Sequence, residues 1–278
     1  MKLAIRGHDL GKKGEFDLVE KLSEFGFDGV QLVPYKTYSD IPQSPEISDD
    51  RANEISTDLK NANKSVVMLG AYFNPVHSKV EKVENGINTF KRYIELAKTF
   101  NATVVGSETG SFNDDKWTYN PLNRTDSALD TVINTFSELC DYAKEFGVNV
   151  GVEGAAGHVC FSPERLFEAV QAIDKPNLKI IFDIYNYLDD ENYADYINIM
   201  KRGLSIFNEK IHCFHMKDCK IVDGKLKQCP IGQGMFDYKL ILSMIKEHNK
   251  DAILILEGTT GEDILPSVQL IKKIWSEI

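Results

Sequence analysis

Short apolar runs alternate with longer amphipathic segments along the whole chain. The runs are rich in β-branched residues, and they predict strands at 3–6, 29–33, 65–69, 103–106, 149–153, 178–183, 211–215 and 253–257. Apolar residues at helical spacing follow each run, and they predict helices at 15–25, 49–62, 80–100, 127–146, from about 163, 193–204, 236–248 and 263–278. The apolar runs do not alternate with polar positions, which is typical of parallel strands buried on both faces.

The number of strand–helix units favours one fold over another. Alternating strands and helices form either a doubly wound sheet or a closed barrel. Eight units without a glycine-rich phosphate loop after the first strand favour an α/β fold of the (β/α)₈ TIM barrel type, which typically takes about 250 residues. We expect residues 1–278 to form a single domain of this kind. The long loop at 107–124 is of a length that is usually functional or disordered.

Composition narrows the class of protein. The net charge is −10, from 42 acidic and 32 basic residues, which argues against broad binding to nucleic acid. Five cysteines, an odd number without a C-x-x-C pair, indicate reduced thiols and a cytoplasmic protein. The N-terminus has no signal-peptide pattern, and no apolar run approaches the roughly 20 residues that span a bilayer. We therefore expect neither nucleic acid nor a membrane as a partner.

The last four predicted strands each end on a side chain that can bind a metal. These residues are Glu153, Asp183, His215 and Glu257. In a TIM barrel the carboxyl ends of all strands meet at one face, where the active site lies. Three carboxylates converging there would repel one another without a cation. Three oxygen ligands and an imidazole suit Mn²⁺, Mg²⁺ or Co²⁺, with Zn²⁺ as the alternative. The sequence thus predicts a site for one divalent metal ion.

Three segments around these residues make the chain resemble the xylose isomerase-like TIM barrel superfamily, in particular its sugar phosphate isomerase/epimerase group. They are residues 178–186, which contain Asp183, residues 215–218, which begin with His215, and residues 230–237. The last segment is similar to the G-x-G-x-x-D sequence that the family carries after strand seven. The resemblance extends over nearly the whole chain, although the N-terminal half matches loosely. Family members often carry Glu on strand two, where this chain has Gln31.

The resemblance implies proton transfer on a small sugar-like substrate, as in the isomerases and epimerases of carbohydrate metabolism. The metal would bind two neighbouring substrate oxygens and stabilise a cis-enediolate. Glu153 and Glu257 would be the catalytic acid and base as well as metal ligands, and Asp183 and His215 would be ligands alone. Relatives are often dimers or tetramers, so a homo-oligomer is one outcome that the sequence leaves open.

Other residues are candidates for the surroundings of the site. Asn186, His158 and Glu108 are predicted to contact substrate, although Asn186 would equally suit a turn and His158 an ordinary loop. Lys217 and Asp218 are interpreted as a salt-bridged rim. His212 is expected to pack behind its strand, outside the site. Lys217, Asp218 and His212 are thus interpreted as structural residues.

Three rival functions are considered. An endonuclease IV-like DNA repair nuclease needs three zinc ions, which six histidines in the chain can hardly supply. A binding protein on the same fold would be expected to have lost a ligand, and none of the four is missing. A metal-dependent dehydratase, of the inosose or dehydroshikimate type, shares the same proton abstraction and stays the main alternative. A free sugar, a sugar phosphate and an inositol derivative all remain open as substrates.

Overall fold

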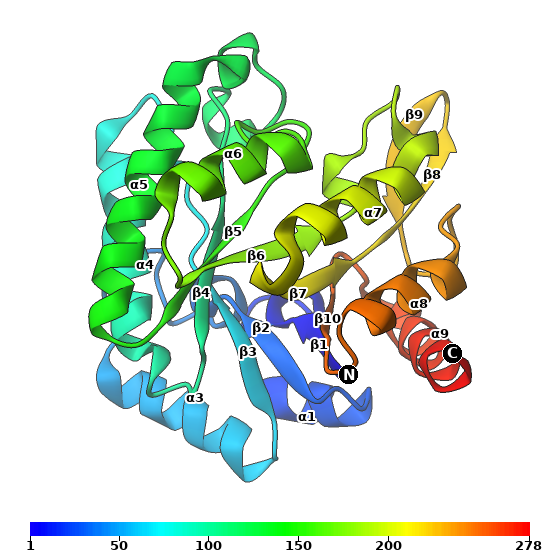
Figure 1. Ribbon diagram of the computed structural model, residues 1–278. Helices are drawn as coiled ribbons and strands as arrows, with labels where there is room; N and C mark the ends of the chain where they lie inside the picture. Colours follow the sequence, from blue (N-terminus) through cyan, green and yellow to red (C-terminus); the bar gives the residue numbers. More distant parts are fainter.

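The computed structural model describes all residues from 1 to 278 and shows eight parallel strands closed into a barrel with helices outside it (Figure 1). The order around the barrel is β1-β10-β7-β6-β5-β4-β3-β2. The predicted (β/α)₈ TIM barrel is therefore confirmed. The barrel strands are β1 (Lys2–Arg6), β2 (Gly29–Leu32), β3 (Ser65–Gly70), β4 (Val104–Glu108), β5 (Asn149–Glu153), β6 (Leu178–Asp183), β7 (Ile211–Met216) and β10 (Ile253–Leu256).

Helices follow the strands as the periodicity predicts. They are α1 (Leu18–Glu24), α3 (Asp49–Asn61), α4 (Val80–Ala97), α5 (Asp126–Glu145), α6 (Pro163–Ile173), α7 (Tyr196–Phe207), α8 (Tyr238–His248) and α9 (Ile264–Glu277). Their starts are fixed by side chains that cap free backbone N–H groups. Ser48, Thr125 and Ser162 each accept a bond from the backbone three residues on, and Pro163 occupies the first position of α6.

The hydrophobic core has two parts, separated by the wall of the barrel. The larger cluster of 67 buried residues includes the side chains between strands and helices. A second cluster of seven buried residues includes Met68 and Ile181. Gly106 and Gly151 make room for Ile181, because a Cβ on either glycine would lie 2.6 Å or 3.1 Å from its Cδ1 atom. This packing fills the barrel and leaves the strand ends to carry polar groups.

The structure differs from the sequence prediction after β7. The segment expected to be a loop forms an antiparallel hairpin of β8 (Asp218–Val222) and β9 (Lys225–Cys229), at the upper right of Figure 1. Its turn is Asp223-Gly224, with φ angles of 54° and 73°. An Asp-Gly pair favours such a two-residue hairpin turn, so the signal was present in the sequence. A short helix, α2 (Pro34–Thr37), was also missed.

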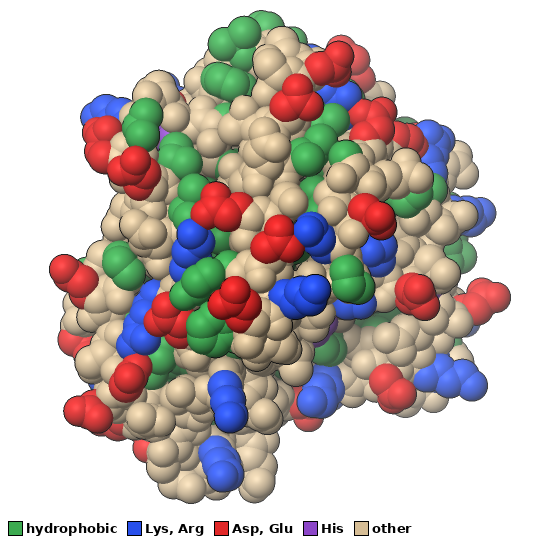
Figure 2. All heavy atoms as spheres, turned by 60° about the vertical axis from the view of Figure 1, so that its left-hand side comes forward, with side chains coloured by type: hydrophobic (Ala, Val, Ile, Leu, Met, Phe, Trp, Pro, Cys, Tyr) green, Lys and Arg blue, Asp and Glu red, His purple; other side chains and the backbone are tan.

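The molecular surface carries charges of both signs. On the face shown in Figure 2, acidic and basic side chains are interspersed, and Lys and Arg form no continuous patch. A membrane-crossing helix is also absent, since none of the helices combines the necessary length with sufficient hydropathy.

Gly203 provides a test of the packing that positions β6. A Cβ atom on this helix residue would lie 2.2 Å from Cε2 of Phe182, the outward-facing neighbour of Asp183. We expect Gly203→Ala to lower the free energy of unfolding by about 1–3 kcal/mol, because the aromatic ring must move out of a filled core. Ser205→Ala, at an exposed position of the same helix, should change it by less than about 0.5 kcal/mol. Chemical denaturation measures the free energy of unfolding of both variants. A Gly203→Ala variant as stable as the wild type would contradict the close packing.

Candidate metal centre

Four side chains from consecutive barrel units converge at the mouth. Ligand atoms of Glu153, Asp183, His215 and Glu257 all lie within 4.8 Å of one another. Glu153 and Asp183 are the last residues of β5 and β6, His215 lies one residue before the end of β7, and Glu257 directly follows β10. Asp183 and His215 are register partners on neighbouring strands. We refer to these four residues as the acidic cluster.

The imidazole of His215 is held so that one nitrogen faces the three carboxylates. Its Nε2 donates to Oε1 of Gln31 at 2.7 Å, and Nε2 of Gln31 donates to the hydroxyl of Tyr72 at 2.5 Å. Its Nδ1 lies 2.8 Å from Glu257 Oε2 and 3.1 Å from Glu153 Oε1. Metal-binding histidines are usually oriented in this way by a partner on the second nitrogen. Gln31, the residue that departs from the family pattern, therefore has a positioning contact.

Two basic side chains reach into the acidic cluster. Nζ of Lys217 lies 2.9 Å from Asp183 Oδ2 and 2.8 Å from Glu257 Oε1, and the residue is only 5% exposed. Arg6 donates from Nη1 to the same Oε1 of Glu257 at 2.7 Å and pairs with Asp9 through two further bonds. The expectation that Lys217 lies on a rim is wrong. Lys217 directly follows β7, and its side chain lies on the same face as that of His215 because side chains alternate along an extended backbone.

Asp218 is also buried, and it anchors the segment that follows β9. Its carboxylate accepts backbone N–H groups from Gly232, Gly234 and Phe236, so it is not a rim residue either. A Cβ on Gly234 would lie 2.1 Å from Asp218 Oδ1, which explains the glycine there. Asp237 then caps α8. The G-x-G-x-x-D segment thus fixes the backbone next to Lys217.

The donor set fits a divalent cation. When His215 is neutral, the form that binds a metal, Asp9, Glu153, Asp183 and Glu257 carry four negative charges against the two positive charges of Arg6 and Lys217, which leaves two uncompensated. Buried charge without compensation is costly, and one divalent ion would cancel this deficit. Oδ2 of Asp183 is buried and contacts the ammonium group of Lys217 at 2.9 Å, a contact that a metal ion would replace.

Burial and neighbouring charges shift the pKa values of the cluster in opposite directions. Burial raises the pKa of Asp183 to about 6 and also raises the pKa of Glu153. Burial acts the same way on Glu257, but Lys217, His215 and Arg6 outweigh it and hold the Glu257 pKa well below its usual range. Burial disfavours the imidazolium of His215, yet Glu153 and Glu257 raise its pKa to about 10. The metal-free cluster therefore retains a proton at neutral pH.

The three predicted substrate residues lie around the cluster. Asn186 donates from Nδ2 to Glu153 Oε1 at 2.7 Å and accepts from Lys217 Nζ at 2.8 Å. Glu108 ends β4 and is the register partner of Glu153. Nδ1 of His158 lies 3.4 Å from Glu108 Oε2 and makes no hydrogen bond. Burial and the charge of Glu257 raise the pKa of Glu108 to about 7.

The sequence analysis missed several residues at the mouth. Arg6 ends β1, so the same rule that selected the four ligands could have found it. Gln31 and Tyr72 lack any local sequence signal for their contact, which exists only because β2 and the segment after β3 meet in the barrel. His212, expected to pack behind its strand, lies 3.1 Å through Nε2 from the carbonyl of Val67, outside the cluster.

Comparison with known proteins gives the family. The family model described as "Xylose isomerase-like TIM barrel" matches residues 19–274. The chain belongs to this family. An uncharacterised protein of Methanocaldococcus jannaschii is 25% identical over 264 residues, which cover 92% of this chain and 83% of that protein.

Two solved structures show the same fold at low identity. A D-tagatose 3-epimerase-like protein has a TM-score of 0.79 and 21% identity, with 100% of this chain and 98% of the other covered. The IOLI protein with a bound zinc atom has a TM-score of 0.74 and 18% identity, with 100% of this chain and 99% of the IOLI chain covered. The xylose isomerase-like barrel of this chain thus shares its shape with an epimerase-like protein and with a zinc-binding one.

The raised pKa of His215 predicts that metal binding depends on pH. A metal ion on Nδ1 must displace the proton, so the apparent Kd for Mn²⁺ should fall about tenfold per pH unit between pH 6.5 and 9. The imidazolium stabilises the metal-free protein fully below about pH 6.5, and this contribution is lost as the pH rises toward about 10. Calorimetric titration of the chelated protein in buffers of different ionisation enthalpy should detect one proton released per metal ion.

The same titration gives the stoichiometry of the site. We expect one ion per chain and no binding to Asp183→Ala. A Kd independent of pH, with no proton released, would contradict the protonated cluster. Three zinc ions per chain would point instead to a nuclease-like centre.

Lys217 should compete with the metal ion. Lys217→Met removes an ammonium group that lies within 3 Å of two carboxylate oxygens, so we expect the Kd for Mn²⁺ to fall about tenfold or more. The metal-free variant should unfold at a lower temperature, since buried carboxylates lose a partner. Lys220→Met, an exposed position on β8, is the control. Weaker metal binding by Lys217→Met would show instead that the ammonium group orders the ligands.

Proposed function

We propose that this protein is a divalent-metal-dependent isomerase or epimerase acting on a small, sugar-like ketone. The observation that carries the proposal is the acidic cluster, in which a glutamate at the end of β5 and another directly after β10 accompany an aspartate and a histidine within 4.8 Å. Family membership and the shape shared with a D-tagatose 3-epimerase-like protein support it. In this proposal Glu153, Asp183, His215 and Glu257 hold the metal ion.

The bound ion would supply Lewis-acid stabilisation of the negative charge that develops when a proton leaves the carbon next to a carbonyl. Glu153 and Glu257 are proposed to move that proton between the two faces of the carbon, or to the adjacent carbon. Glu153 is buried and the side chain of Glu257 is only 13% exposed, so both carboxylates are largely shielded from bulk water.

The two glutamates have different partners, which suggests an order of events. Glu257 Oε1 contacts two cations, Arg6 and Lys217, and its Oε2 contacts His215. Both hydrogen bonds to Glu153 fall on Oε1, so its Oε2 is free to approach a substrate hydrogen. We assign Glu153 as the first base, and Glu257 as the group that handles the proton on the other side.

Lys217 and Asn186 are proposed to orient the substrate. Nζ of Lys217 is a donor at the level of the cluster, and it would hydrogen-bond a substrate oxygen when Asp183 and Glu257 turn toward the metal. Asn186 connects Lys217 to Glu153 and so fixes the carboxylate of the proposed base.

Glutamine substitution tests the proton transfer. Glu153→Gln should retain the fold and most of the metal affinity, while turnover falls about 10²–10⁴-fold, because an amide cannot accept the proton. Incorporation of solvent deuterium into a panel of ketoses and inososes measures this step. Glu262→Gln, on the exposed surface after β10, is the matched control.

Two outcomes would change the conclusion. Near-normal deuterium exchange by the Glu153→Gln variant would exclude Glu153 as the base. Loss of one water from the substrate, seen as an enone by mass and absorbance, would identify a dehydratase that uses the same proton abstraction.

A further inference from the structure

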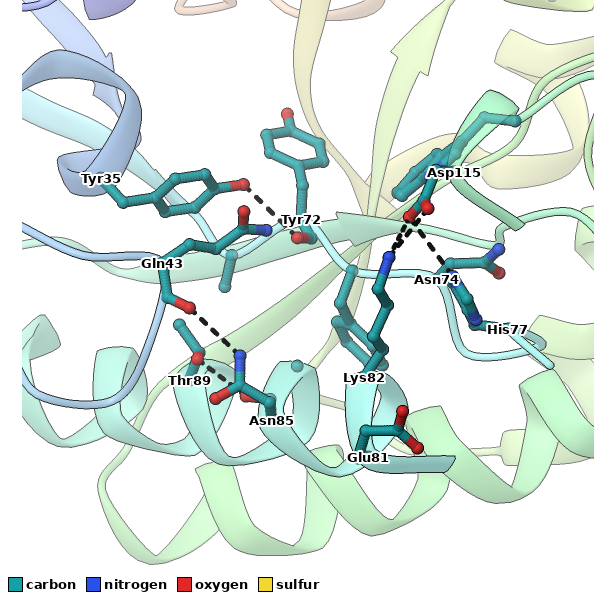
Figure 3. A pocket seen from close by; sticks show the side chains of 14 residues that line it. Tyr35, Gln43, Tyr72, Asn74, His77, Glu81, Lys82, Asn85, Thr89 and Asp115 are labelled. Carbon is teal, nitrogen blue, oxygen red and sulfur yellow. Dashed lines mark hydrogen bonds and ion pairs between the residues drawn. The ribbon is translucent and has the colours of Figure 1, made fainter. Parts of the chain in front are cut away.

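A cavity of about 400 Å³ lies among the segments that follow β2, β3 and β4 and has no part in the chemistry described above (Figure 3). Its walls come from the segment after β3, the first half of α4, the 35–43 region and the loop that follows β4. Cavities of roughly 300–1,000 Å³ are typical of small-molecule sites. Its size is therefore sufficient for part of a ligand.

Two residues of the cavity lining contact neighbours of the acidic cluster, although none of the four cluster residues lines the cavity itself. Tyr72 lines the cavity, and its hydroxyl accepts the bond from Gln31, which in turn holds His215. Trp117 lines it as well, and its ring lies 5.5 Å from the ring of His158, the neighbour of Glu108. Tyr72 and Trp117 are thus the lining residues through which the cavity adjoins the surroundings of the acidic cluster.

The lining groups suit an uncharged polyhydroxy compound. Tyr35 and Gln43 lie on one side of the cavity in Figure 3, where the hydroxyl of Tyr35 donates to the backbone carbonyl of Tyr72 at 3.5 Å. Asn85 donates from Nδ2 to the backbone carbonyl of Gln43 at 3.1 Å. The side-chain amide of Gln43 and the Oδ1 atom of Asn85 make no hydrogen bond within the protein. Aromatic faces pack against the apolar faces of a sugar ring, and free amide groups hydrogen-bond its hydroxyls.

The charges of the cavity disfavour an anionic group. Lys82 is the single Lys or Arg in the lining, and both carboxylate oxygens of Asp115 neutralise it at 2.6 Å and 2.8 Å, as Figure 3 shows. Glu81 adds a negative charge without an ion-pair partner. A phosphate or carboxylate would therefore find no free cation among the lining residues; the ammonium group of Lys36, 5.3 Å from the ring centre of Tyr72, lies outside the lining.

We propose that this cavity is a subsite for an uncharged glycosyl unit, so that the substrate is a glycoside whose keto sugar lies at the acidic cluster. The inference rests on the proposed isomerase or epimerase function for the identity of the reacting unit. The subsite itself rests on the cavity, its aromatic and amide lining and its lack of a free cation.

Turnover of disaccharides tests the proposal. With the Mn²⁺-loaded protein, we expect kcat/KM for solvent deuterium exchange to be at least tenfold higher for the best of maltulose, leucrose and isomaltulose than for D-fructose. Asn85→Trp places an indole at the cavity from an exposed helix position, and it should abolish this advantage while D-fructose stays within twofold. Asn88→Trp, exposed on the same helix but outside the lining, should behave as wild type.

Three results would overturn the proposal. The first is turnover of D-fructose that equals or exceeds that of the best disaccharide. The second is an equal loss of disaccharide and D-fructose turnover in Asn85→Trp. The third is a preference for fructose 6-phosphate over the disaccharides.

A binding measurement separates this proposal from the proposed function. Methyl α-D-glucoside should quench the fluorescence of Trp117 saturably in the metal-free protein, and glucose 6-phosphate should not. The Trp117→Phe variant, in which only Trp275 fluoresces, should lose the quenching and so assigns it to Trp117. Asn85→Ala should weaken the binding of the glucoside several-fold. If no ketose exchanges deuterium but the quenching persists, the function fails and the subsite stands. If quenching is absent, the subsite is excluded whatever the enzyme turns over.

Discussion

Repulsion among Glu153, Asp183 and Glu257 is the interaction that the rest of the mouth is built to balance. At a separation of 4 Å and an effective dielectric constant of 20, two like charges repel by about 4 kcal/mol. Lys217 and His215 lie between these carboxylates, each within 3.1 Å of two oxygens. Such contacts stabilise the carboxylates in the absence of a metal ion, and they also mean that an ion would have to compete with a proton and an ammonium group to bind.

The barrel explains why residues so distant in sequence share this task. Parallel strands end at one face, so a side chain at the end of any strand is close to the others. Precision then comes from the connecting segments. Asp218 binds backbone N–H groups of the 232–236 segment, and the hydroxyl of Tyr238 donates to the carbonyl of Lys217 at 2.6 Å. The hairpin after β7 and the segment that follows it thus hold the backbone of Lys217, whose ammonium group lies in the acidic cluster.

Much of this arrangement could be predicted from the sequence, and the limits have physical causes. Strand β6 was predicted to its last residue, because an apolar run stops abruptly on Asp183. The mutual proximity of the four acidic-cluster residues followed from the barrel, while their role as metal ligands stays a prediction. The environment of Lys217 was misjudged, because a charged residue was assumed to be exposed when three polar partners in fact surround it. The contact from Tyr72 to Gln31 depends on the register between neighbouring strands, which hydrophobic periodicity does not specify.

The asymmetry between the two glutamates bears on the kind of reaction that this site can perform. Glu257 contacts the guanidinium of Arg6 and the ammonium of Lys217, whereas Glu153 receives a neutral amide from Asn186. Their environments therefore push their proton affinities apart, which is how paired carboxylates acquire separate acid and base roles. A nuclease-like centre would need several imidazoles, yet only His215 belongs to this cluster. A pair of unequal carboxylates beside one candidate metal position is better suited to the proposed movement of a single proton than to activating water on a phosphodiester.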